Sequence, residues 1–149
     1  MKDKYYTPSL EEFHVGFEFE WVKPDRTETI KLECLNNIGF LWGITIPEGV
    51  RVKYLDREDI ESLGFEYDGK SCLDETWEKE ESIVDTWSYY VDTTEDKEKY
   101  YSLYSQGKLC YITYTAYQNS VGSTVEQVFK GTIKNKSELK KVLKMLNIN

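Results

Sequence analysis

Apolar and polar residues alternate between positions 13 and 21, and this period of two constrains the fold more than any other feature of the chain. One face of the segment is predicted to carry Phe13, Val15, Phe17, Phe19 and Trp21. The residues between them are polar or glycine, which is typical of a strand in an antiparallel sheet with one face in water. We therefore expect a half-buried strand over residues 13–21.

Further short strands are expected along the rest of the chain. Runs rich in threonine, isoleucine and tyrosine are separated by glycine, proline, asparagine and aspartate, which favour turns. These runs cover residues 27–32, 39–46, 50–54, 65–67, 86–92, 99–104 and 109–117, with one more strand within 121–133. Residues 105–108 form a tight turn between two of the strands, so the second half of the chain is predicted to be a meander.

A short helix is expected over residues 57–63. Asp56 occupies the N-cap position, where a carboxylate accepts a hydrogen bond from the first turn, and Asp59 lies at the third helical position. Gly64 follows as a C-terminal stop. Residues 76–84 are compatible with either a helical turn or a charged loop, because their pattern favours neither.

The chain closes with a second predicted helix over residues 136–146. Its apolar stripe consists of Leu139, Val142, Leu143 and Leu146. Asn135 is expected to cap this helix, with Glu138 in the position that completes a capping box. The predicted fold is therefore α+β: an antiparallel β-meander with a short helix near 57–63 and a C-terminal helix near 136–146 packed on the sheet. Residues 1–149 are expected to form a single domain.

The net charge of −8 is distributed unevenly. Residues 56–98 contain 16 acidic and four basic side chains, a charge of −12, whereas residues 101–149 carry seven lysines and two glutamates, a charge of +5. Affinity for a phosphate backbone comes mainly from lysine and arginine, so the overall charge disfavours direct binding of nucleic acid.

Two interpretations of the acidic stretch stay open. A run of charges often does no more than keep a protein in solution. Carboxylates interleaved with aromatic side chains also form recognition surfaces, since rings supply binding energy and charges steer association. The residues predicted to bind a basic protein are Asp74, Glu75, Trp77, Glu78, Glu80, Glu81, Trp87, Tyr89 and Tyr90.

Catalytic signatures are absent from the sequence. His14 is the only histidine, and no nucleophile elbow, P-loop, dinucleotide fingerprint or H-E-x-x-H motif occurs. We therefore expect no catalytic residue and no cofactor. One weak metal candidate remains, because His14, Glu18 and Glu20 would share one face of the first strand, with the two glutamate Cα atoms about 7 Å apart. A solvent-facing strand produces the same pattern.

The remaining composition predicts a cytoplasmic protein that does not associate with membranes. The N-terminal residues lack the apolar stretch of a signal peptide, and no run approaches the length of a membrane span. Three widely separated cysteines, Cys34, Cys72 and Cys110, support neither a disulfide framework nor a paired zinc site. We interpret them as reduced thiols.

Three segments resemble small uncharacterised proteins of bacteriophages and prophage-like elements. The clearest is the strand–helix segment Arg51–Phe65, and Tyr5–Glu18 and Phe129–Leu139 are similar to the same group. The resemblance carries no catalytic residue. It implies a phage origin, and therefore a location in the cytoplasm of the host cell.

By analogy with such proteins, the leading hypothesis is a non-enzymatic acidic interaction protein. It would inhibit a basic, nucleic-acid-handling host protein, as anti-CRISPR proteins do. One alternative is a metal-dependent hydrolase or nuclease that uses His14, Glu18 and Glu20. Another is a structural or assembly protein that forms homo-oligomers through its tyrosine-rich strands.

Overall fold

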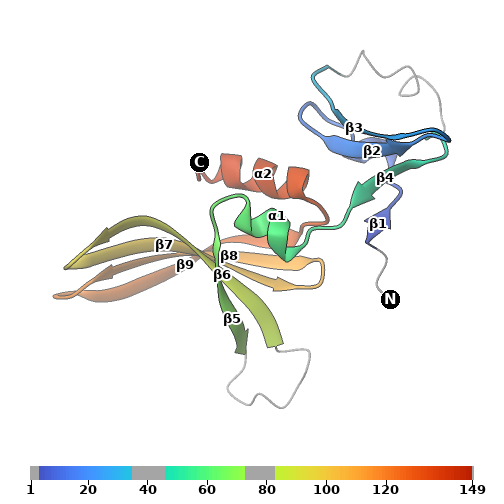
Figure 1. Cartoon of the computed structure of the whole chain (residues 1–149). Helices are drawn as coiled ribbons and strands as arrows, with labels where there is room; N and C mark the ends of the chain where they lie inside the picture. The colour runs from blue at the N-terminus through green and yellow to red at the C-terminus, as the bar shows by residue number, and fades with distance from the viewer. Residues whose placement is uncertain (1–3, 35–45, 73–82, 149) are drawn as a thin grey trace. The chain divides into compact units, whose positions relative to one another are not determined.

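The computed structural model describes residues 4–34, 46–72 and 83–148 of the chain (Figure 1). The chain divides into two compact units. The first unit combines residues 1–55 with residues 135–149, and the second comprises residues 56–134. The C-terminal helix therefore belongs to the same unit as the N-terminal strands.

The first unit contains a four-stranded antiparallel sheet in the order β1-β4-β2-β3. Its elements are β1 (Tyr5–Tyr6), the 3-10 helix η1 (Leu10–Glu12), β2 (Glu18–Val22), β3 (Thr27–Lys31), β4 (Val50–Lys53) and α2 (Lys136–Met145). A hydrophobic core beside this sheet is formed by Phe13, Phe17, Phe19, Leu32, Val50 and Val52. Three aromatic rings thus supply much of the buried apolar surface of this unit.

The predicted strand over residues 13–21 is only partly correct, because β2 begins at Glu18. Residues 14–17 form a turn in which the Phe17 amide donates to the His14 carbonyl, and Gly16 has a φ of 89°. Val15, which the alternation assigned to the buried face, is exposed. The turn preserves the burial of Phe13 and Phe17 without an extended backbone between them.

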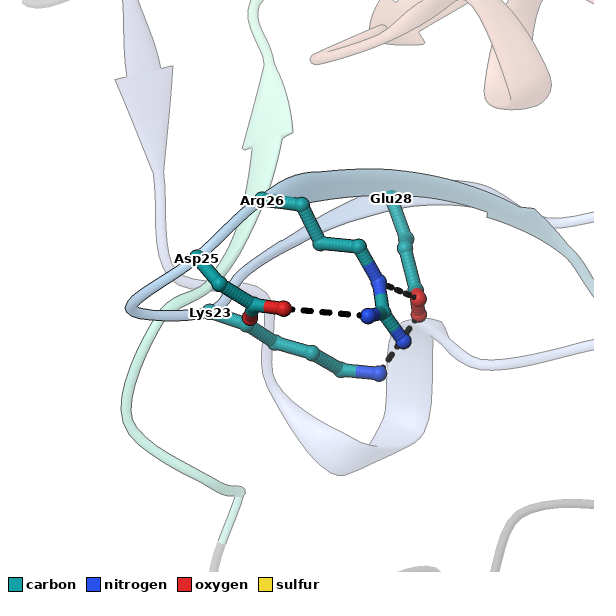
Figure 2. A network of polar contacts seen from close by, with 4 residues as sticks. All are labelled: Lys23, Asp25, Arg26 and Glu28. Carbon is teal, nitrogen blue, oxygen red and sulfur yellow. Dashed lines mark hydrogen bonds and ion pairs between the residues drawn. The ribbon is translucent and has the colours of Figure 1, made fainter.

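A short turn joins β2 to β3, and four charged side chains form a polar network beside it (Figure 2). The Lys23 amide donates to the Arg26 carbonyl at 2.8 Å. Glu28 accepts from Lys23 Nζ at 2.6 Å and from Arg26 Nε, and Asp25 pairs with the other side of the guanidinium. The hydrogen bond from Lys23 lowers the pKa of Glu28 most, and the hydrogen bond from Arg26 lowers it further.

Hydrogen bonds cap helix α2 at both ends: a side chain accepts from a backbone amide at its start, and backbone amides donate to backbone carbonyls at its end. The predicted cap is confirmed, since Asn135 Oδ1 accepts from the Glu138 amide at 2.9 Å. At the other end Asn147 adopts a left-handed φ of 56°, and the Ile148 amide donates to the Leu143 carbonyl at 2.9 Å. This is a Schellman motif with asparagine in the usual place of glycine.

The second unit contains α1 and a five-stranded antiparallel sheet in the sequential order β5-β6-β7-β8-β9. The elements are α1 (Arg57–Glu61), β5 (Glu66–Cys72), β6 (Ile83–Thr94), β7 (Lys97–Gln106), β8 (Leu109–Gln118) and β9 (Gly122–Thr132). The predicted meander is confirmed here, but the described strands form two sheets rather than one. Most of the predicted segments 39–46 and 76–84 lie outside the described residues.

Helix α1 follows the prediction at its start and is two residues shorter at its end. Asp56 Oδ1 accepts from the Asp59 amide at 3.0 Å. The Leu63 and Gly64 amides donate to carbonyls only three residues earlier, so the last turn tightens after Glu61. Gly64 then leaves the helix with a φ of 92°, which favours glycine.

The two faces of the five-stranded sheet differ in composition. On the face that we call the covered face, Trp87 lies opposite Leu103, which lies opposite Ile112, and all three are buried. Helix α1 and the residues that follow it contact this face: Arg57 lies over the Tyr67 ring, and the Phe65 ring centroid is 5.4 Å from that of Tyr89. The register places serine, threonine and tyrosine on the other side, which we call the tyrosine face.

Candidate functional site

Tyr90 and Tyr100 lie opposite each other on β6 and β7, on the tyrosine face. Their ring centroids are 5.6 Å apart and the ring planes are inclined by 43°. Tyr90 is 49% exposed, which is high for a large ring in a central strand of a sheet. The pair therefore offers accessible aromatic surface.

Three carboxylates accompany these rings. Glu66 lies opposite Ser88, and Ser88 Oγ donates to Asp68 Oδ2 at 2.5 Å, so β5 contributes two acidic residues near Tyr90. Glu98 precedes Tyr100 by two positions on β7, and it therefore shares its face. The acid–tyrosine patch is defined as the set Glu66, Asp68, Tyr90, Glu98 and Tyr100.

The carboxylates of the acid–tyrosine patch are not neutralised by cations of the described chain. Neither Glu66 nor Glu98 forms an ion pair or a side-chain hydrogen bond with any described residue, and the partner of Asp68 is the neutral hydroxyl of Ser88. Partial burial raises the pKa of Tyr90, and the charges of Asp68 and Glu98 raise it further. The surface around the ring is therefore electronegative.

Exposed apolar side chains border the acid–tyrosine patch. Tyr117 lies opposite Glu98 on β8, and Tyr100 lies opposite Thr115, which in turn lies opposite Val125 on β9. Val125 is 65% exposed. Exposed rings and apolar side chains beside unpaired charges are typical of a protein-binding surface.

Three of the predicted protein-binding residues are described, and of these three Tyr90 alone belongs to the acid–tyrosine patch. Trp87 is 4% exposed and lies on the covered face, so it is not accessible as a binding residue. Tyr89 is half-buried and packs against Phe65. The pleat of β6 turns residues 87 and 89 to one side and residue 90 to the other.

The other predicted binding residues cannot be placed. Asp74, Glu75, Trp77, Glu78, Glu80 and Glu81 lie outside the described residues. Conversely, Glu66, Asp68 and Glu98 belong to the acidic stretch but are not among the residues that the sequence predicts to bind a partner. Only the pairing of β5, β6 and β7 brings them beside Tyr90, and local periodicity contains no information about pairing.

The structure does not bring His14, Glu18 and Glu20 together as a metal site. His14 lies in the turn before β2, where Nδ1 is 2.9 Å from the Val15 carbonyl oxygen. Glu18 accepts from Lys140 Nζ at 3.1 Å, and Glu20 pairs with Arg51 at 2.8 Å. Within residues 4–34, 46–72 and 83–148, no three histidine, cysteine, aspartate or glutamate side chains are grouped closely enough to hold a metal ion.

No protein-family model, curated protein or solved structure matches this chain. None of the helices in the described part of the chain is long and apolar enough to cross a membrane.

Proposed function

We propose that this chain is a non-enzymatic binding protein whose second unit binds a basic protein. The division into units supports this proposal because it separates the charges. Residues 56–134 contain 17 acidic and eight basic side chains, a charge of 8 − 17 = −9, whereas the first unit carries 11 basic and ten acidic side chains, a charge of +1. The second unit therefore carries the negative charge that would attract a basic partner.

The acid–tyrosine patch is the observation that carries the proposal. A solvated face needs only charges, and these are normally scattered among cations and small polar residues. In the acid–tyrosine patch, by contrast, carboxylates that form no ion pair with any described residue lie beside a half-exposed pair of tyrosine rings. Tyrosine is enriched at the centre of protein interfaces, where it contributes a large contact area at a low cost in side-chain entropy.

The proposed partner is a protein that handles nucleic acid. Such proteins present grooves of lysine and arginine to phosphates, and an acidic protein surface competes for the same groove. Binding in this groove would exclude the nucleic acid, so the protein would inhibit its partner by occupying the binding site and would catalyse no reaction.

A capture experiment tests this proposal. Immobilised wild-type protein and the triple variant Glu66→Gln, Asp68→Asn, Glu98→Gln are exposed to bacterial lysate at low salt, after which retained proteins are identified by mass spectrometry. The expected result is retention of a nucleic-acid-handling protein with a basic surface by the wild type, its loss in the triple variant, and its release by about 0.5 M salt.

A control that removes a single negative charge, and is therefore matched in charge to Glu98→Gln, is available on the covered face. Glu126 lies opposite Tyr114 on β9 and is exposed, so Glu126→Gln changes the net charge at a site away from the acid–tyrosine patch. A second variant neutralises Asp74, Glu75, Glu78, Glu80 and Glu81. Retention that survives both the triple variant and the five-residue variant would refute the proposal.

Self-assembly is a second candidate function, favoured by strand β9. This strand is at the edge of the five-stranded sheet, and residues 122–127 are all exposed. An exposed edge strand is a template for pairing with another strand. Light scattering over a hundredfold concentration range would show a constant dimer or larger oligomer if this function is correct, and a monomer if it is not.

A further inference from the structure

We propose that the acid–tyrosine patch binds an arginine side chain of the partner, its guanidinium stacked on the ring of Tyr90 or Tyr100 and paired with Asp68 or Glu98. This inference rests on the proposed function and names the group that the surface recognises. It is supported by two places where the same chain already holds an arginine in this way.

The first internal example lies in the four-stranded sheet. The guanidinium carbon of Arg51 lies 4.0 Å from the centroid of the Tyr5 ring. Arg51 Nε and Nη2 are 2.9 Å and 2.8 Å from Glu20 Oε2. The ring of Tyr5 and the carboxylate of Glu20 thus both contact the guanidinium of Arg51.

The second internal example lies beside α1. The guanidinium carbon of Arg57 lies 4.1 Å from the centroid of the Tyr67 ring, and Arg57 Nε donates to Glu61 Oε1 at 2.5 Å. The Tyr67 hydroxyl donates to Asp85 at 2.8 Å, which adds a further negative charge near the same ring. The combination of ring, carboxylate and arginine therefore occurs in both units.

The acid–tyrosine patch has the ring and the carboxylates but no cation from the described chain. Lys99 and Lys97 are on the adjacent part of β7, but the register places them on the covered face, opposite Asp92 and Thr94 of β6. Lys130 is on the tyrosine face, where its Nζ lies over the Tyr111 ring. A cation from a partner would complete the arrangement seen at Arg51 and Arg57.

Arginine fits this site better than lysine does. Its planar guanidinium stacks on a ring while donating two parallel hydrogen bonds to a carboxylate, and it is more weakly hydrated than an ammonium group. A lysine ammonium is a compact charge that would gain mainly from the overall negative potential. The inference therefore predicts a preference between two peptides of equal charge.

The test uses fluorescein-labelled hexa-arginine and hexa-lysine peptides with the full chain, at 50 mM salt, and measures fluorescence anisotropy. We expect hexa-arginine to bind about three- to fivefold more tightly than hexa-lysine. The double variant Tyr90→Leu, Tyr100→Leu is expected to remove this preference, whereas Glu98→Gln weakens binding of both peptides. Glu126→Gln, the charge-matched control on the covered face, should retain the preference.

The wild-type protein provides a second measurement that needs no variant. In a ¹³C- and ¹⁵N-labelled sample, hexa-arginine should shift the ring resonances of Tyr90 and Tyr100 more than those of Tyr101 and Tyr114, which pack together on the covered face. Equal affinity for both peptides, or unchanged Tyr90 and Tyr100 resonances on binding, would overturn the inference. If one of these results occurred but the triple variant lost the basic partner in the capture experiment, the proposed function would stand and only the inference about arginine would be wrong.

Discussion

The hydroxyl of Tyr6 accepts a hydrogen bond from Asn135 Nδ2 at 2.8 Å and donates one to Glu12 Oε2 at 2.6 Å. Asn135 is 2% exposed and caps α2, so this contact joins the first strand to the last helix across 129 residues of sequence. Burial, followed by the bond to Glu12, raises the pKa of Tyr6 well above its usual range. The network fixes the C-terminal helix to the N-terminal strands within the first unit.

Replacement of Tyr6 by phenylalanine should destabilise the protein. The change removes one hydroxyl and leaves the buried amide of Asn135 without this partner, which lowers the free energy of unfolding by about 1–3 kcal/mol. Urea denaturation followed by circular dichroism measures the effect. Tyr5→Phe is the matched control, because the Tyr5 hydroxyl makes only a 3.5 Å contact with Glu20, and a loss of equal size there would contradict the role assigned to Tyr6.

The same network predicts a loss of stability at alkaline pH. The folded state keeps a proton on Tyr6 that the unfolded state loses once the pH passes about 10, so this contribution is complete below pH 10 and declines as the pH rises toward the folded pKa. The free energy of unfolding of the wild type should fall more steeply above pH 10 than that of Tyr6→Phe, by up to about 1.4 kcal/mol per pH unit. Tyr67 and Tyr90, whose pKa values are also raised, are present in both proteins. Parallel curves would exclude the effect.

Gly49 is predicted to tolerate no side chain. Its φ is 88°, and a Cβ atom there would lie 2.3 Å from the carbonyl oxygen of Val22. Gly49→Ala should therefore lower the free energy of unfolding by more than about 2 kcal/mol, through backbone strain and displacement of β2. Gly107→Ala separates backbone strain from the steric clash, because Gly107 also has a positive φ but has open space where a Cβ atom would lie. This substitution should lower the free energy of unfolding by only about 1 kcal/mol.

Electrostatic coupling within the acid–tyrosine patch can be measured without a partner. Because the charge of Glu98 raises the pKa of Tyr90, Glu98→Gln should lower that pKa toward the ordinary value of 10.0. Titration of the Tyr90 ring ¹³Cζ resonance by NMR gives the value directly. Glu126→Gln should leave the titration of Tyr90 where it is, and an equal shift in both variants would show that only net charge matters.

Local sequence signals predicted the starts of both helices better than the layout of the sheets. Asp56 and Asn135 cap α1 and α2 as expected, because capping depends on residues within one turn of each other. The prediction of a strand over residues 13–21 was wrong for the residues before Glu18. Alternation of apolar and polar residues does not distinguish an extended backbone from a turn that buries Phe13 and Phe17. The position of Gly16 was the one signal that favoured a turn.

The sequence by itself determined the antiparallel strands, the meander of the second unit, the helix caps and the concentration of acidic residues between 56 and 98. These features follow from period, turn residues and composition, which act over a few neighbouring positions. The tertiary structure decided that the strands form two sheets and that α2 joins the N-terminal strands through Tyr6 and Asn135. It also decided that Tyr90 lies on the same side of the sheet as Tyr100 and near Asp68 and Glu98, while Trp87 is buried on the other side. Strand register sets these relationships, because a shift of one residue would exchange the two faces of every strand.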